Sequence, residues 1–268
     1  MPAAGAAGAC AFTAPTLRPT PDPSRAPVIH LPTELPDSLT YDQTLPLYEY
    51  DRSVPVAVQE KAVYPRGKAV FLDEYVDEAL AMADHGVASI LVAGYFPWYV
   101  TPSDKGSDRA GMIGQVRELR RAIDLLQSQA DFDPERIAFV GHSMGAMHGA
   151  NLVAVDRRVK AAVLMVPHST MADWIFAGYG LDPSTEKAYR AAMTPFDPIA
   201  FVPHAAPAAL FFQFGADDVY LPRQVAESLY AAASEPKRVG FYDGGHDLDA
   251  LAMAQRDAWL IEQLALNT

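Results

Sequence analysis

The pentapeptide Gly-His-Ser-Met-Gly at residues 141–145 is the stretch that decides how this chain folds. A short apolar run at 136–140 precedes it, and the small apolar residues 146–154 follow it. These flanks predict a strand that turns sharply into a helix packed beneath a sheet, with glycines placed where side chains would collide. In a strand, G-x-S-x-G and helix unit, the serine is held on a strained turn with its hydroxyl exposed. The sequence therefore predicts Ser143 as a nucleophile.

Two later segments supply partners for Ser143, in the order acid and then histidine. A buried-strand run at 208–214 leads into Gly-Ala-Asp-Asp at 215–218, and a last strand at 238–243 leads into two glycines and His246. Both polar groups follow the carboxyl ends of strands, where the loops of a parallel sheet meet. We expect His246 to accept the serine proton and return it to the leaving group.

Three motifs resemble those of the α/β-hydrolase family, especially its dienelactone-hydrolase-like and prolyl-oligopeptidase-like esterases. They are Gly-His-Ser-Met-Gly-Ala, Phe-Gly-Ala-Asp-Asp-Val-Tyr-Leu-Pro and Tyr-Asp-Gly-Gly-His-Asp-Leu, and the resemblance fades upstream of Gln115. In that family the acid stands three residues after the strand-end glycine and four before a proline, which fits Asp218. The resemblance thus implies a triad of Ser143, Asp218 and His246, with Asp217 capping the next helix or facing solvent.

Strand and helix patterns alternate along the chain, which predicts an α/β fold with a mostly parallel sheet. The resemblance implies an α/β-hydrolase fold of about seven to eight strands with helices on both faces. Besides the segments already given, we expect helices at 73–84, 112–129 and 250–266, strands at 87–93 and 159–166, and edge strands at 45–50 and 54–58.

The chain is predicted to hold a Pro/Ala-rich, disordered or extended arm at 1–35 and one α/β-hydrolase domain at 36–268. A short helical lid at about 167–207 interrupts the sheet pattern within that domain. Its size suits a small or medium acyl or alcohol group. The expected substrate-binding residues are His142, Trp174, Phe176 and Tyr179. Alternatively, the aromatic residues only hold the lid to the body.

The oxyanion hole is where the chain departs from the family, because the third-strand region at 63–73 is shortened. One donor, the Met144 N–H, follows from the serine turn. The second is the backbone around Phe71 and Leu72 or the hydroxyl of Tyr95. A missing donor costs about 3 to 4 kcal/mol of transition-state stabilisation.

Composition narrows the possible partners. A net charge of −12 argues against nucleic acid and anionic membranes. The single cysteine, Cys10, allows no intrachain disulfide. We find neither metal-ligand spacing nor a dinucleotide fingerprint, so we expect no metal and no cofactor. Without a spanning run or a signal-peptide pattern, we expect a cytoplasmic protein whose partner is a small-molecule acyl substrate.

These patterns predict a serine hydrolase that cleaves a small to medium carboxylic ester through an acyl-enzyme. A thioesterase or an acyltransferase would use the same triad. A weakly active or non-catalytic binding protein with an incomplete oxyanion hole is the third interpretation. The sequence sets neither the physiological substrate nor the oligomeric state.

Overall fold

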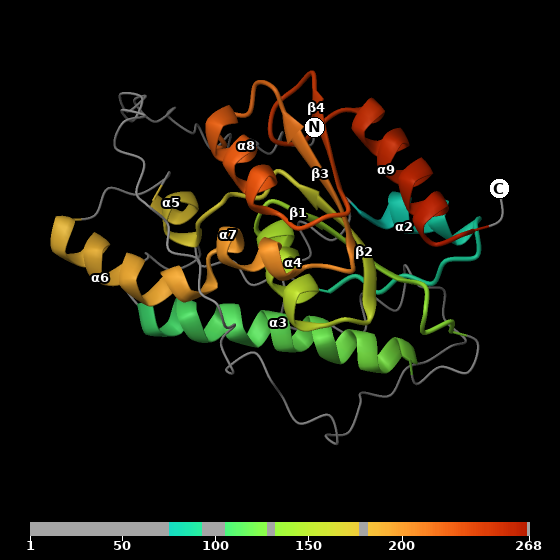
Figure 1. Cartoon of the computed structure of the whole chain (residues 1–268), viewed down its shortest axis with the longest axis horizontal. Helices are drawn as coiled ribbons and strands as arrows, with labels where there is room; N and C mark the ends of the chain where they lie inside the picture. The colour runs from blue at the N-terminus through green and yellow to red at the C-terminus, as the bar shows by residue number, and fades with distance from the viewer. Residues whose placement is uncertain (1–74, 93–104, 128–131, 177–181, 267–268) are drawn as a thin grey trace, which may run out of the picture. The chain divides into compact units, whose positions relative to one another are not determined.

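A computed structural model describes residues 75–92, 105–127, 132–176 and 182–266 of this chain (Figure 1). All of them belong to the compact unit Leu31–Thr268. The expected arm, the two edge strands at 45–58 and the shortened region at 63–73 lie outside the described residues.

Four parallel strands form the described sheet, in the order β1-β2-β3-β4. They are β1 (Ile137–His142), β2 (Val159–Met165), β3 (Ala209–Gly215) and β4 (Lys237–Tyr242). Parallel neighbours cannot be joined by tight hairpins, so helical segments connect each strand to the next. The predicted α/β architecture is confirmed.

Helices cover both faces of this sheet (Figure 1). α4, α7 and α8 lie on one face, with α3 packed against α4, while α2 and α9 lie on the other. The helices are α2 (Val76–Ala83), α3 (Lys105–Gln127), α4 (Met144–Val155), α5 (Met171–Phe176), α6 (Pro183–Met193), α7 (Pro198–Phe201), α8 (Arg223–Ala232) and α9 (Ala250–Gln263), with 3-10 turns at Thr194–Phe196 and Val202–His204.

The strand β2 shows why the sequence folds as a sheet buried on both faces. Ala162 and Leu164 belong to the core beneath α4 and α8, whereas Ala161, Val163 and Met165 belong to the core beneath α9. Successive side chains of a strand point to opposite faces, so an uninterrupted apolar run fills both cores. Because both faces of the sheet are covered by apolar cores, the loops that follow the carboxyl ends of the strands are the places where polar side chains can gather.

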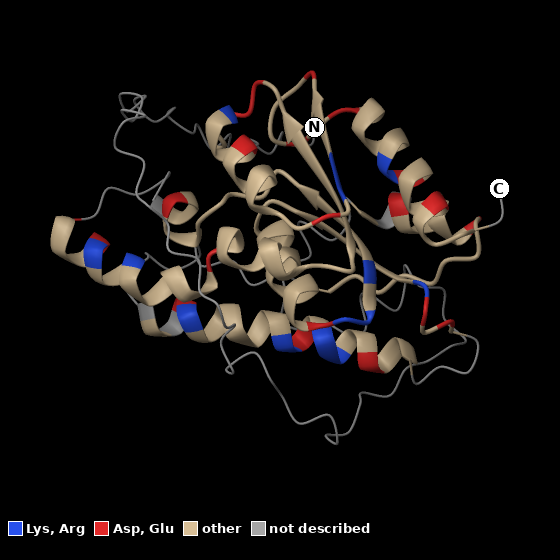
Figure 2. Ribbon diagram, in the orientation of Figure 1, with Lys and Arg blue, Asp and Glu red and all other residues tan. Residues whose placement is uncertain are grey.

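Ion pairs join α3 to the amino end of β2. Arg158 contacts Asp124 at 2.5 Å and Asp156 at 2.6 Å, and Arg120 contacts Asp156 at 3.1 Å. Basic and acidic residues follow one another along this helix (Figure 2). The basic groups here are thus matched by acidic ones.

Two of the expected elements differ from the structure. α3 begins at Lys105 rather than at residue 112, because Asp108 in its first turn suits the helix dipole and accepts a bond from Tyr189. Residues 87–92 form no strand, so the strand predicted at 87–93 is wrong over its described part. Its apolar pattern is present, but a strand also needs a hydrogen-bonded neighbour, and among the described strands β1 pairs only with β2.

Candidate active site

Ser143 occupies the sharp turn between β1 and α4. Its backbone has φ 54° and ψ −117°, a conformation that costs free energy in a residue with a side chain. A Cβ atom at Gly141 would lie 2.7 Å from the backbone of Gly145, so only glycine fits there. A Cβ at Gly145 would meet no described atom within 4 Å, so a collision of its own side chain is the wrong reason for that glycine. The predicted strain at Ser143 is confirmed.

Ser143, His246 and Asp218 form a continuous hydrogen-bonded relay. Ser143 Oγ lies 2.9 Å from His246 Nε2, and His246 Nδ1 lies 2.8 Å from Asp218 Oδ2. With Nδ1–H donating to the carboxylate, Nε2 is left to accept the serine proton. The Asp218 side chain is 1% exposed and that of His246 is 20% exposed. The acid is therefore shielded while the imidazole borders solvent.

The loop after β4 carries His246 across the carboxyl end of the sheet. Its backbone passes so close to β3 that a side chain at Gly215 would clash with the carbonyl oxygens of Gly244 and Gly245. The Asp217 N–H donates to the Gly244 carbonyl at 2.9 Å. A glycine at the end of β3 is thus required to bring the histidine loop over the sheet.

Asp218 and Asp217 have different surroundings. Besides the His246 contact, Asp218 accepts a bond from the Tyr220 N–H at 2.8 Å through its other oxygen. Asp217 is exposed, and α8 is capped by Pro222 without a side-chain bond. The expectation that Asp217 caps this helix is wrong, and the alternative of an exposed residue holds.

Two aromatic rings flank the imidazole of His246. The His142 ring meets it edge-on at 4.9 Å between centroids, and the Tyr220 ring does so at 5.3 Å. His142 Nε2 also lies 2.7 Å from the His246 carbonyl oxygen. Sequence reasoning missed Tyr220, for which the available signal was an aromatic residue two positions after the acid; its side chain is 52% exposed. The structure thus places His142 against the histidine loop.

The oxyanion hole is only half described. Met144 is the first residue of α4, so its N–H belongs to the positive end of that helix, beside Ser143. Phe71, Leu72 and Tyr95 lie outside the described residues. The second donor therefore remains a prediction.

Helices α5 to α7 and their 3-10 turns make up the described part of the segment expected to form a lid. Trp174 is 8% exposed and belongs to one buried cluster with Met144, Met147 and Tyr189. This packing favours the alternative in which the aromatic ring holds the lid to the body. The side chain of Phe176 and the whole of Tyr179 lie outside the described residues.

Polar bonds also anchor the lid. The buried Tyr189 hydroxyl donates to Asp108 on α3 at 2.7 Å. The Asn151 side chain on α4 donates to the Phe196 carbonyl at 3.0 Å. The lid is therefore fixed to both α3 and α4.

Two titratable side chains, those of His168 and Asp197, are buried within the segment expected to form the lid. Burial lowers the pKa of His168 to about 4 and raises the pKa of Asp197 to about 7. His168 accepts a bond from the Thr170 N–H at 3.2 Å, and Asp197 accepts one from the Met171 N–H at 2.8 Å. His168 is therefore neutral near pH 7.

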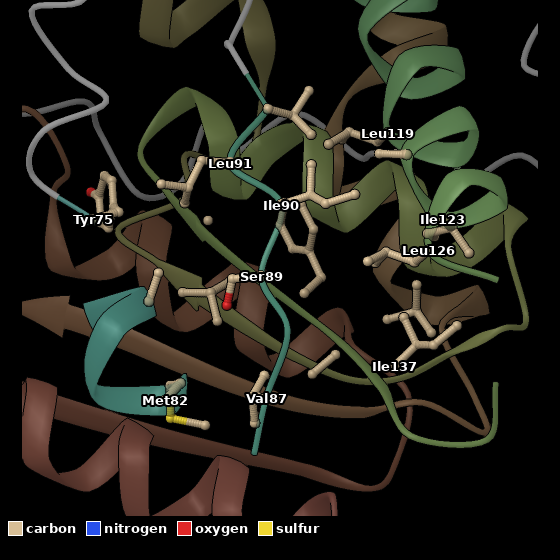
Figure 3. Close-up of a pocket in the computed structure, with 18 of the residues that line it drawn as sticks. Tyr75, Met82, Val87, Ser89, Ile90, Leu91, Leu119, Ile123, Leu126 and Ile137 are labelled. Carbon is tan, nitrogen blue, oxygen red and sulfur yellow. The ribbon is translucent and has the colours of Figure 1, made fainter. Parts of the chain in front are cut away.

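An apolar cavity of about 310 Å³ lies beside the serine turn (Figure 3). Side chains of residues 87–92, α3 and β1 line it, among them Ile90, Leu91 and Leu119. Its lining reaches His142 and Gly145, but Ser143, Asp218 and His246 are not part of it. The cavity is thus separate from the relay.

Two further properties hold for the part of the chain that the structure describes. No group of three or more His, Cys, Asp or Glu side chains there could hold a metal ion. Nor is any helix within the described ranges both long enough and apolar enough to cross a membrane.

Comparisons with known proteins agree with this architecture. A sequence model of the alpha/beta hydrolase fold matches residues 100–213. An acetyl xylan esterase from a Paenibacillus species aligns with a TM-score of 0.54 and 19% identity, covering 66% of this chain and 60% of that one. Acetyl xylan esterase 1 from a Thermoanaerobacterium species aligns with a TM-score of 0.53 and 15% identity, covering 67% and 61%. At such identities the likeness concerns the fold.

Two relatives found by sequence are named as uncharacterized proteins. An uncharacterized protein of Mycobacterium tuberculosis is 32% identical over 177 residues, which are 65% of this chain and 59% of that protein. The uncharacterized protein YfhR of Escherichia coli is 27% identical over 166 residues, which are 58% and 53% of the two chains. This chain thus matches little more than half the length of these relatives. The sequence match and the structural likeness thus agree on the α/β-hydrolase fold.

Proposed function

Since the chain belongs to the α/β-hydrolase family, we propose that it is a serine hydrolase of small to medium carboxylic esters. The observation that carries this proposal is the relay from Ser143 through His246 to Asp218, at 2.9 and 2.8 Å, beside a strained serine backbone. An unpaired serine hydroxyl is a weak nucleophile, and an adjacent base oriented by a third group activates it.

The proposed reaction proceeds through an acyl-enzyme. Ser143 Oγ attacks the ester carbonyl carbon while its proton passes to His246 Nε2. The C–O bond then breaks, and the alkoxide leaves with that proton as an alcohol. Water, deprotonated by His246, then attacks the acyl carbon. The bond from this carbon to Ser143 Oγ breaks, Oγ regains the proton from His246, and the carboxylic acid leaves. Asp218 holds the imidazole in the required tautomer and stabilises its transient positive charge.

The Met144 N–H at the start of α4 stabilises the oxyanion that forms in both steps. The second donor comes from the backbone near Phe71 and Leu72 or from the Tyr95 hydroxyl. A short acyl group is proposed because two solved structures that share this fold are named acetyl xylan esterases. We further propose that the enzyme is soluble and cytoplasmic, and that it acts on a small acyl substrate without a metal or cofactor.

A panel of p-nitrophenyl esters with acyl chains from acetate to decanoate tests it. We expect turnover to be highest for the shortest chains and to fall at least about a thousandfold in Ser143→Ala. Circular dichroism of Ser143→Ala serves as the control for folding. Absence of turnover with every ester by the folded wild type would refute the proposal, as would turnover retained in the variant.

A further inference from the structure

His142 connects the serine turn to the loop that carries His246. Its Nε2 atom lies 2.7 Å from the His246 carbonyl oxygen, although the two residues are 104 positions apart in the sequence. A carbonyl oxygen can only accept, so the ring nitrogen must donate. This contact fixes the His142 tautomer as the one protonated at Nε2.

The connection matters because the two loops start from opposite edges of the described sheet. β1 precedes Ser143 and β4 precedes His246, and two strands lie between them. Three strand spacings amount to about 14 Å, which the histidine loop must cross. The Asp217 N–H holds this loop over β3 through the Gly244 carbonyl at 2.9 Å. His142 holds the far end of the loop, at the backbone of His246 itself.

The environment of His142 keeps this bond compatible with proton transfer. Burial lowers the pKa of His142, so the ring is neutral near pH 7. The charged or titratable groups that face it are His246, Asp218 and Asp247, and the Tyr75 ring lies 6.4 Å away. A neutral ring donates its Nε2–H without placing a second positive charge beside the imidazolium that forms on His246.

We propose that His142 is a positioning residue, whose bond to the His246 carbonyl sets the imidazole against the Ser143 hydroxyl, and that it is not a substrate contact. This inference rests on the proposed function, because it assigns His142 to the reaction of Ser143. Small displacements of a base from its nucleophile slow proton transfer, while substrate binding is unaffected. The bond should therefore influence kcat more than KM.

Three substitutions of His142 separate the bond from the volume of the ring. His142→Leu fills similar space without a donor, and in His142→Asn the shorter amide does not reach the carbonyl. In His142→Gln the amide nitrogen takes the place of Nε2 and donates again. We expect kcat for p-nitrophenyl acetate to fall about tenfold in the Leu and Asn variants, with KM within twofold, and to recover to within threefold in the Gln variant.

His204→Leu is the matched control, because it changes another histidine at the opposite end of the sheet. The Arg157 side chain, just before β2, donates to the His204 carbonyl at 2.9 Å, which places this residue at the amino ends of the strands. We expect its kcat to remain that of the wild type. The inference is overturned if His142→Leu retains full kcat, if KM rises while kcat is kept, or if Gln is no better than Leu.

A measurement on the wild type covers the case in which the variants do not fold. Long-range ¹H–¹⁵N NMR of histidine-labelled protein should show His142 protonated at Nε2 near neutral pH, and the Nδ1-protonated tautomer would overturn the inference. Wild-type turnover that Ser143→Ala abolishes tests the proposed function separately. A folded wild type without turnover would refute both, whereas wild-type turnover with unchanged kcat in His142→Leu would refute only the positioning role.

Discussion

The carboxyl edge of the sheet and the lid use polar side chains in opposite ways. At the edge, Ser143 and His246 are bonded to each other, and the imidazole borders solvent. In the lid, Tyr189 and Asp197 are buried and bond to the groups that hold the lid in place. If the proposed function holds, the edge carries the reaction and the segment expected to form the lid contributes to stability. Substitutions at the edge should therefore lower kcat. Substitutions in the lid should change the free energy of unfolding or its dependence on pH.

The largest effect is expected at Asp218. In Asp218→Asn the amide cannot hold the His246 tautomer or stabilise its positive charge, so kcat should fall about 10⁴-fold. Asp217→Asn is the matched control, because the neighbouring carboxylate is exposed and does not contact His246; its kcat should fall less than tenfold. Kinetics with p-nitrophenyl acetate decide between the two acids. A larger loss of kcat in Asp217→Asn than in Asp218→Asn would show that Asp218 is not the acid that acts with His246.

Gly141→Ala tests the geometry of the serine turn. The added methyl group would meet the Gly145 backbone at 2.7 Å, so β1 and α4 must move apart. A displacement of the nucleophile by about 1 Å lowers kcat/KM about a hundredfold. Gly114→Ala is the control: it lies within α3, has no described atom within 4 Å of the new Cβ, and should stabilise the helix by about 0.5 to 1 kcal/mol. Full activity of Gly141→Ala would contradict the role given to this glycine.

Tyr189→Phe addresses the lid. The substitution keeps the ring and removes the buried hydroxyl that bonds to Asp108, which should lower the free energy of unfolding by about 2 to 3 kcal/mol. Tyr220→Phe, whose residue is exposed, should change it by less than about 0.5 kcal/mol. Urea unfolding measures both values. A Tyr189→Phe variant with unchanged stability and a large loss of kcat would break the comparison between edge and lid.

Asp197 gives the smallest effect, and it depends on pH. Burial raises its pKa to about 7, above the unfolded value of about 3.9. Between these values the folded chain keeps a proton that the unfolded chain releases, so this group lowers stability as the pH rises. Asp197→Asn cannot ionise and keeps an acceptor for the Met171 N–H, although its buried amide nitrogen offsets part of the gain.

Urea unfolding at two pH values measures this contribution. Asp197→Asn should be more stable than the wild type by about 1 kcal/mol at pH 8, and the difference should shrink at pH 5. His168, whose lowered pKa makes the folded chain less stable as the pH falls from 6.5 toward 4, is present in both proteins and cancels from the difference. An equal difference at both pH values would show that Asp197 does not titrate in this window.

The serine turn could be predicted from the sequence because its constraints are local. Gly141, the apolar flanks and the small residues of α4 lie within a few positions of one another, and a side chain at Gly141 would collide with the backbone of Gly145. The choice of Asp218 rested on spacing, and the structure puts this carboxylate beside His246. The continuous apolar run of β2 predicted a strand because both faces of a parallel sheet are buried.

Contacts between distant segments could not be predicted in the same way. The bond from His142 to the His246 carbonyl depends on how the last loop crosses the sheet, which no local pattern encodes. The first turns of α3 are polar and contain glycine, so no apolar pattern marks the start of the helix. The Tyr189 hydroxyl, which is distant in sequence, bonds to Asp108 in the first turn. Residues 87–92 have the composition of a strand, but strand formation depends on a neighbour elsewhere in the chain.

Covalent labelling tests the central claim most directly. A fluorophosphonate forms a stable adduct only with a serine activated by a base, and it needs no knowledge of the substrate. The account predicts one adduct per chain, located by peptide mass spectrometry on Ser143, and no adduct in either Ser143→Ala or His246→Ala. No adduct on the folded wild type, or one on another residue that persists in both variants, would contradict it.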